Sequence, residues 1–176
     1  MTQMPLATLA TQDGNEVNNQ LADATWYRAA FSKAQLRERM VEFWTDHFTI
    51  SLNKVGYLKL VDDRDVIRAN ALGTFPELLR ATSQSAAMLR YLDQNLSRTP
   101  TPNQNYAREI MELHTLGVDG GYSQTDVAEL SRILTGWTTA GAGTFAFNRT
   151  FHDRNAKTFL GQIGRASCRE RVSSPV

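Results

Sequence analysis

The residues from Asn105 to Gly117 carry the side chains best suited to chemistry in this chain. The segment reads NYAREIMELHTLG and contains an amide, a guanidinium, two carboxylates and an imidazole. In a helix, residues three or four positions apart share a face. His114 therefore falls on the mostly apolar face, and Gly117 is placed to end the helix. The polar stripe on the other face consists of Asn105, Arg108, Glu109 and Glu112.

Two interpretations of this stripe are open. Two carboxylates at i and i+3, Glu109 and Glu112, can bind one cation from a single face. Either one could also act as an acid or base if burial raised its pKa. In the structural interpretation the stripe is solvated, Arg108 pairs with Glu112, and His114 is a hydrogen-bonded core histidine. Such an exposed pair contributes only about 0.3–0.5 kcal/mol.

A site on this helix would need a histidine from elsewhere, since His114 points away from the stripe. His47 follows aromatic residues at a helix end, where donation to a backbone carbonyl favours a structural role. His152 and Asp153 lie in an expected loop, a common location for functional residues, and Lys157 follows. Mixed histidine and carboxylate sites suit zinc, iron or manganese, so a divalent metal is the candidate cofactor. The candidate catalytic residues are Glu109, Glu112, His152 and Asp153. The candidate metal ligands are His47, Glu109, Glu112 and His152.

Other common sites are absent from the sequence. It has no H-E-x-x-H zinc motif, no G-x-S-x-G hydrolase motif and no glycine-rich phosphate loop. The Asp-Gly-Gly-Tyr segment at 119–122 lacks the remaining ligands of a calcium loop. A non-enzymatic alternative therefore stands beside the enzyme hypothesis. In that alternative, ionic residues fix the helix register and the protein is a helical scaffold or binding module.

The hydrophobic pattern predicts a mainly α fold, a multi-helix orthogonal bundle with a short β-hairpin near the C-terminal end. Residues 1–19 are polar and are expected to be loose, and residues 20–161 form the helical domain. Alternating residues after Gly141 predict a hairpin that ends near Leu160. Helices are expected near residues 21–30, 32–47, 62–72, 74–82, 83–94, 105–117 and 123–137.

Several segments together resemble one family of large bacterial proteins, catalogued as domain of unknown function 1800. They begin with RMVEFWTDHF at 39–48 and continue with DVIR at 65–68 and MLRYLD at 88–93. The Asn105 segment, LTGW at 134–137 and HD at 152–153 follow in the same order. The resemblance covers roughly residues 20–161, and its ordered combination of motifs is specific.

The resemblance implies a context rather than a reaction. Family members look about two to three times longer than this chain, which resembles an internal fragment. They often look exported, so a periplasmic or exported location is expected for the full-length family, while the location of this fragment stays open. Their genes commonly neighbour those of a sulfatase-like family, numbered 1501, which suggests a partner. We therefore expect an envelope-associated scaffold or partner protein. The alternative is a hydrolase-like enzyme that uses Glu109, Glu112 and His152.

The last residues, 163–176, do not fit this resemblance. The run IGRASCRERV reads as a translated sequencing adapter, so we interpret residues 163–176 as an artefactual tail. Excluding it removes three arginines, one glutamate and the only cysteine, and changes the net charge from +1 to −1. The chain then has no basic excess for nucleic-acid binding and no cysteine for disulfides. No apolar run predicts a transmembrane segment, and no signal peptide is recognisable.

Overall fold

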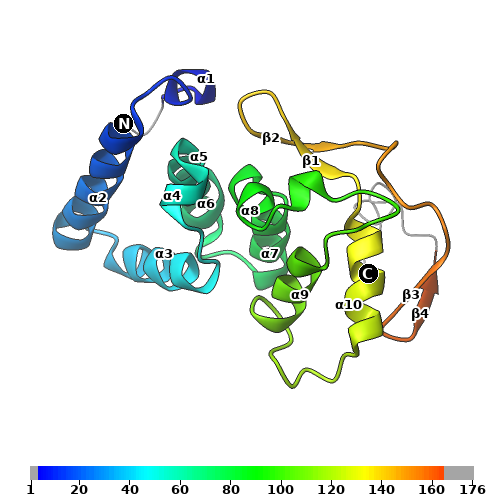
Figure 1. Ribbon diagram of the computed structural model, residues 1–176. Coiled ribbons are helices and arrows are strands. Elements are labelled where there is room, and N and C mark those ends of the chain that lie inside the picture. The colour runs from blue at the N-terminus through cyan, green and yellow to red at the C-terminus, as the bar shows by residue number, and fades with distance from the viewer. Residues whose placement is uncertain (1–3, 165–176) are drawn as a thin grey trace. The chain divides into compact units, whose positions relative to one another are not determined.

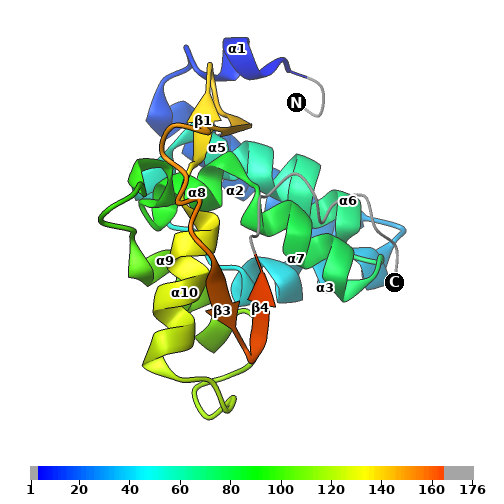
Figure 2. The same ribbon diagram turned by 90° about the vertical axis from the view of Figure 1, so that its right-hand side faces the viewer.

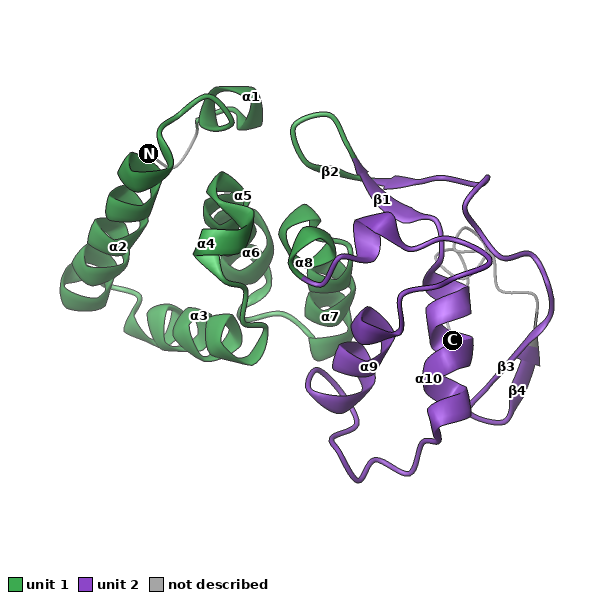
Figure 3. Ribbon diagram, viewed as in Figure 1, with its two compact units in different colours: residues 1–91, 140–145 green, residues 92–139, 146–176 purple. Residues whose placement is uncertain are grey.

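The fold is mainly α-helical, as predicted, in the computed structural model, which describes residues 4–164 (Figure 1). The chain divides into two compact units (Figure 3). Unit 1 contains residues 1–91 and 140–145, and unit 2 contains residues 92–139 and 146–176. Residues 165–176, most of the predicted artefactual tail, lie outside the described part. Within residues 4–164, no helix is both long and apolar enough to cross a membrane.

Unit 1 is a series of helices that begins earlier than predicted. Residues 1–19 were expected to be loose, but α1 and the first turns of α2 lie there. The Asp13 carboxylate caps α2 by accepting hydrogen bonds from the backbone of Asn15 and Glu16, at 2.9 and 3.2 Å. The elements are α1 (Leu6–Leu9), α2 (Gly14–Phe31), α3 (Gln35–His47), α4 (Leu52–Val55), α5 (Tyr57–Val61), the π-helical η1 (Asp62–Ile67), α6 (Arg68–Asn70), α7 (Phe75–Ser83) and α8 (Ala86–Tyr91).

Among the described residues, unit 2 contains two α-helices, α9 and α10, and short strands. The predicted hairpin near the C-terminal end is confirmed, and a second strand pair accompanies it. Strand β3 pairs antiparallel with β4 and packs beside α10 (Figure 2). A capping box of Ser123 and Asp126 begins α10. The elements are the 3-10 turn η2 (Gln94–Leu96), α9 (Gln104–Glu112), α10 (Gln124–Leu134), β1 (Trp137–Ala140), β2 (Thr144–Phe147), β3 (Lys157–Phe159) and β4 (Gln162–Gly164), except that residue 140 of β1 and residues 144–145 of β2 belong to unit 1.

Helix α10 ends at Leu134, before Trp137, which the helical pattern included. The reason lies at Gly136, whose φ of 88° is in the left-handed region. This turn lets the Gly136 carbonyl accept a hydrogen bond from Asn148 N at 2.7 Å. A Cβ at position 136 would lie 2.6 Å from Asn148 O and 3.2 Å from His152 Cβ. Glycine therefore permits both the change of direction into β1 and the close approach of the following loop.

Replacing Gly136 by alanine should destabilise the chain strongly. The substitution adds both a strained φ and a backbone clash, so we expect a loss of about 2–4 kcal/mol of unfolding free energy. Urea denaturation followed by circular dichroism measures it. Gly14→Ala is the matched control, because Gly14 starts α2 and a Cβ there meets no atom within 4 Å. Equal stability of the two variants would contradict this account of the turn.

Candidate functional site

The side chain of Arg132 connects the end of α10 with the loop between β2 and β3. Its Nε donates to Asp153 Oδ2 at 2.8 Å, and its Nη1 donates to Glu129 Oε1 at 2.6 Å. Its Nη2 donates to the carbonyl of Ala156 at 3.2 Å. The other Glu129 oxygen accepts from the backbone of Thr158 at 3.0 Å. One guanidinium thus holds the helix, the loop and the start of β3 together.

Asp153, one of the candidate catalytic residues, is buried inside this network. Burial raises the pKa of its carboxyl, but the hydrogen bonds from Arg132 and from Asn155 N outweigh that effect and lower the pKa overall. Asn155 N donates to Asp153 Oδ1 at 2.8 Å. This carboxylate is therefore held in its ionised form, which suits an ion pair better than a proton donor at neutral pH.

His152 is buried beside the end of α10. Its Nδ1 lies 2.8 Å from the carbonyl oxygen of Thr135 and 3.4 Å from the hydroxyl of the same residue. Because a carbonyl only accepts, Nδ1 carries the proton in this contact. The imidazole also contacts the ring of Phe147 edge-on, with centroids 5.3 Å apart. The hydroxyl of Thr135 accepts a hydrogen bond from Asp153 N at 2.9 Å, so both His152 and Asp153 are hydrogen-bonded to Thr135.

Lys157 completes the polar interior of the loop. Its side chain is buried, and its ammonium donates to the carbonyl of Asp153 and, at 3.0 Å, to that of Asn155. The ammonium is 3.9 Å from Asp153 Oδ1. Burial lowers the pKa of Lys157, and the charge of Asp153 opposes that shift. The contacts of Lys157 and of Asn155 N close the loop on itself, and those of His152 and Asp153 join it to the end of α10, an arrangement that fits a structural role.

The two carboxylates of the Asn105 segment lie on α9 of the same unit. Glu109 and Glu112 are half-buried, and His114 is buried. Arg108 donates to Gln124 Oε1 of α10 at 2.9 Å, in place of the pair with Glu112 considered above. Among residues 4–164, no three His, Cys, Asp or Glu side chains gather into a group that could hold a metal ion.

His47, the remaining candidate metal ligand, belongs to unit 1. Its ring is surrounded by aromatic rings of α3 and α7, with centroid distances of 5.6 Å to Trp44, 4.6 Å to Phe48 and 6.3 Å to Phe75. The indole Nε1 of Trp44 donates to Ala71 O at 3.2 Å and ties this cluster to the end of α6. The FWxxHF part of the family motif thus forms an aromatic cluster in unit 1, in which Phe48 is buried and Trp44 and His47 are half-buried.

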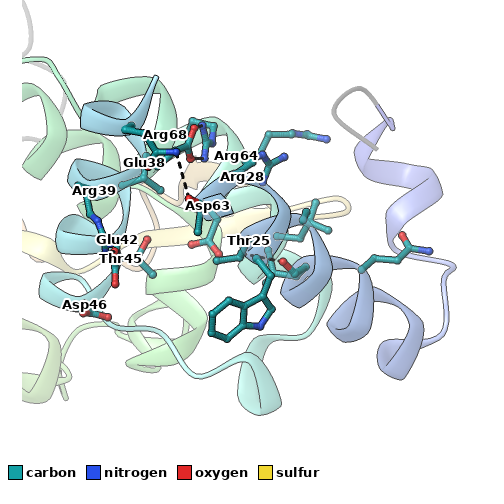
Figure 4. A pocket seen from close by; sticks show the side chains of 18 residues that line it. Thr25, Arg28, Glu38, Arg39, Glu42, Thr45, Asp46, Asp63, Arg64 and Arg68 are labelled. Atoms are coloured by element: carbon teal, nitrogen blue, oxygen red, sulfur yellow. Dashed lines mark hydrogen bonds and ion pairs between the residues drawn. The ribbon is translucent and has the colours of Figure 1, made fainter. Parts of the chain in front are cut away.

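Unit 1 also has a groove that the motifs did not predict. It has a volume of about 430 Å³ and lies among α2, α3 and the α5–η1 segment (Figure 4). Its apolar lining comes from Leu21, Ala24, Ala29, Val41 and Leu60. Figure 4 labels ten polar and charged lining residues, among them Arg28, Glu38, Arg39, Asp63 and Arg68.

Ion pairs neutralise much of the charge along this groove. Both guanidinium Nη atoms of Arg68 donate to the carboxylate of Glu38, one of them at 3.1 Å. The bond from Arg68 is the main reason that the pKa of Glu38 is lowered. Arg39 pairs with Glu42 at 2.6 Å. The groove therefore combines an apolar lining with balanced charges and favours neither a strong anion nor a strong cation.

A family model matches nearly the whole chain. The model of a family described as "Protein of unknown function (DUF1800)" matches residues 2–173. The chain belongs to the DUF1800 family. This confirms the resemblance drawn from the motifs, but the match extends beyond residues 20–161 and includes residues 163–173 of the segment interpreted as an artefactual tail. No curated protein and no solved structure matches the chain.

Sequence reasoning missed Glu129, Arg132 and Thr135 in this DUF1800 chain. Glu129 and Arg132 have the i,i+3 spacing of a helical ion pair, and that signal was present. The partner in the loop, Asp153, is 21 residues away from Arg132, and no local pattern reveals such a pair. The groove of unit 1 gave no sequence signal, because its lining is drawn from three separate helical segments.

Removing the Asp153 carboxylate should cost stability in a pH-dependent way. The depressed pKa means that this carboxylate stabilises the folded state at neutral pH, and that the contribution is lost as the pH falls below about 4. We expect Asp153→Asn to lower the unfolding free energy by about 2 kcal/mol at pH 7, and by less at pH 3. Urea denaturation at both pH values measures this. Asp119→Asn, in an exposed turn, is the control, and an equal loss at both pH values would contradict the prediction.

Proposed function

We propose that this DUF1800 chain is part of a non-enzymatic scaffold or partner protein of the cell envelope. The observation that carries the proposal is a set of large apolar side chains exposed on α2 and α3. Trp26 is 76% exposed and Phe31 is 71% exposed, values unusual for residues of this size. Exposed apolar surface of this kind is typical of protein interaction sites. The exposed set consists of Trp26, Tyr27, Phe31, Leu36 and Phe43.

The groove and the aromatic residues of α2 support the same function. Trp26 lines the groove, so this exposed indole ring and the apolar lining belong to one surface. Tyr27 and Phe31 are one helical turn apart, with ring centroids 5.1 Å apart, and form a rigid apolar feature. Tryptophan and tyrosine are the residues that most often dominate binding energy at interfaces. Such a groove suits an apolar side chain, or an amphipathic helix, of a partner protein.

The partner and location in this proposal come from the family resemblance. The neighbouring genes make the sulfatase-like protein the first partner to test. With both proteins purified, we expect isothermal titration calorimetry to detect a complex. Trp26→Ser should weaken it by roughly thirtyfold, which corresponds to about 2 kcal/mol. Asn19→Ala, an exposed polar position of α2, is the control. Undiminished affinity of Trp26→Ser would remove this surface from the proposal.

The competing hypothesis is a metal- or carboxylate-dependent, hydrolase-like enzyme built on Glu109, Glu112 and His152, with Asp153 and His47 in support. It predicts a metal bound in stoichiometric amount that is lost in Glu109→Gln. The scaffold proposal predicts the opposite, a purified chain with no stoichiometric zinc, iron or manganese. Elemental analysis after dialysis separates the two, and Glu129→Gln controls for the loss of a carboxylate elsewhere in unit 2. A metal that depends on Glu109 would overturn the scaffold proposal.

A further inference from the structure

Asp62 is a buried carboxyl group that neither the motifs nor the proposed function uses. Asp62 is the first residue of the π-helical segment η1, and it is only 1% exposed. Oδ1 accepts a hydrogen bond from the hydroxyl of Ser85, which lies between α7 and α8. Oδ2 is buried and has no hydrogen-bond partner among the described residues. A buried acceptor without a partner is unusual and calls for a physical reason.

The charged groups around Asp62 do not neutralise it. The charge of Lys59, on α5, acts on Asp62, but the Lys59 ammonium is bonded to Asp63 Oδ1 at 2.6 Å. Asp63 itself adds a like charge next to Asp62 in the chain. From the α7–α8 side, the contact is the neutral hydroxyl of Ser85. An ionised Asp62 would therefore be a buried charge with one neutral hydrogen bond, which is costly.

We infer that Asp62 is a proton-dependent latch, which holds η1 against the α7–α8 turn when neutral and loosens it when ionised. The location fits such a role, because π-helical turns are rare and are frequently functional. The latch needs no ligand or partner and is independent of the aromatic surface of α2 and α3. Its consequence is that η1 changes its stability within a range of pH that cells experience.

The direction of the effect follows from the shift in pKa. Burial raises the pKa of Asp62 to about 6, opposed by the Ser85 hydrogen bond and by Lys59 and reinforced by Asp63. In an open form the pKa returns toward 3.8. The closed form thus binds the proton more tightly, and its advantage is lost as the pH rises from about 4 to about 6. Between pH 4 and pH 7 the opening equilibrium should increase by roughly fiftyfold.

Hydrogen exchange of the whole chain, followed by mass spectrometry, tests this inference. After correction for intrinsic exchange rates, residues 62–67 should exchange at least about tenfold faster at pH 7.5 than at pH 4.5. In Asp62→Asn the segment should be protected equally at both pH values. Asp65→Asn, whose side chain is half exposed and paired with Arg64, is the matched control and should keep the wild-type dependence. A wild-type segment with the same protection at both pH values would overturn the latch.

A second variant keeps the inference testable if Asp62→Asn does not fold. Ser85→Ala retains the carboxyl group and removes the hydrogen bond that lowers its pKa. The midpoint of the pH-dependent exchange should therefore move to a higher pH than in the wild type. Direct titration of the Asp62 carboxyl by carbon NMR provides the same value independently. A midpoint below pH 4.5 in the wild type, or a downward shift in Ser85→Ala, would contradict the inference.

Discussion

Charges that are buried or half-buried must be neutralised within the chain, and this constraint determines much of the structure. In unit 2, Arg132 binds Asp153 and Glu129 and thereby fixes the loop between β2 and β3 on the end of α10. In unit 1, Arg68 binds Glu38 and joins α6 to α3. Such pairs add uncertain net stability, but breaking one leaves an unpaired charge in the interior. These ion pairs therefore favour one packing arrangement of the segments, which local helix propensity alone does not determine.

The helical class of the fold was predictable because helix formation depends on local patterns. The capping box of Ser123 and Asp126 gave the start of α10 correctly, since both bonds lie within one turn. The end of α10 was not predictable, because Trp137 continues the apolar period while Gly136 turns the backbone away. The start of α2 at Gly14 was not predicted, because the polar residues around the Asp13 cap show no apolar periodicity.

The candidate site was predictable only in part, for a related reason. The sequence placed the HD pair at 152–153 in a loop as a candidate site, and the structure shows which residues it contacts. Its members are bound by Thr135 and Arg132, which approach from α10 across about 20 residues of sequence. Polar residues in a loop are needed either for chemistry or to satisfy a buried backbone. The sequence alone does not separate these needs, whereas the contacts of Asp153 and Lys157 fit the second.

Asp62 and the exposed aromatic residues are exceptions to the usual burial pattern in opposite ways: Asp62 is a buried carboxyl group, and the aromatic residues are exposed apolar side chains. The buried charges of Lys59 and Asp153 are paired with Asp63 and Arg132, so a buried carboxyl without a cationic partner at Asp62 is an exception. Similarly, Val17 and Phe48 are buried as expected for apolar residues, whereas Trp26 and Phe31 are exposed. In stable proteins the residue type suits its structural environment at most positions. Exceptions concentrate where function imposes another requirement. The requirement that we propose is a binding partner for Trp26 and Phe31, and a proton for Asp62.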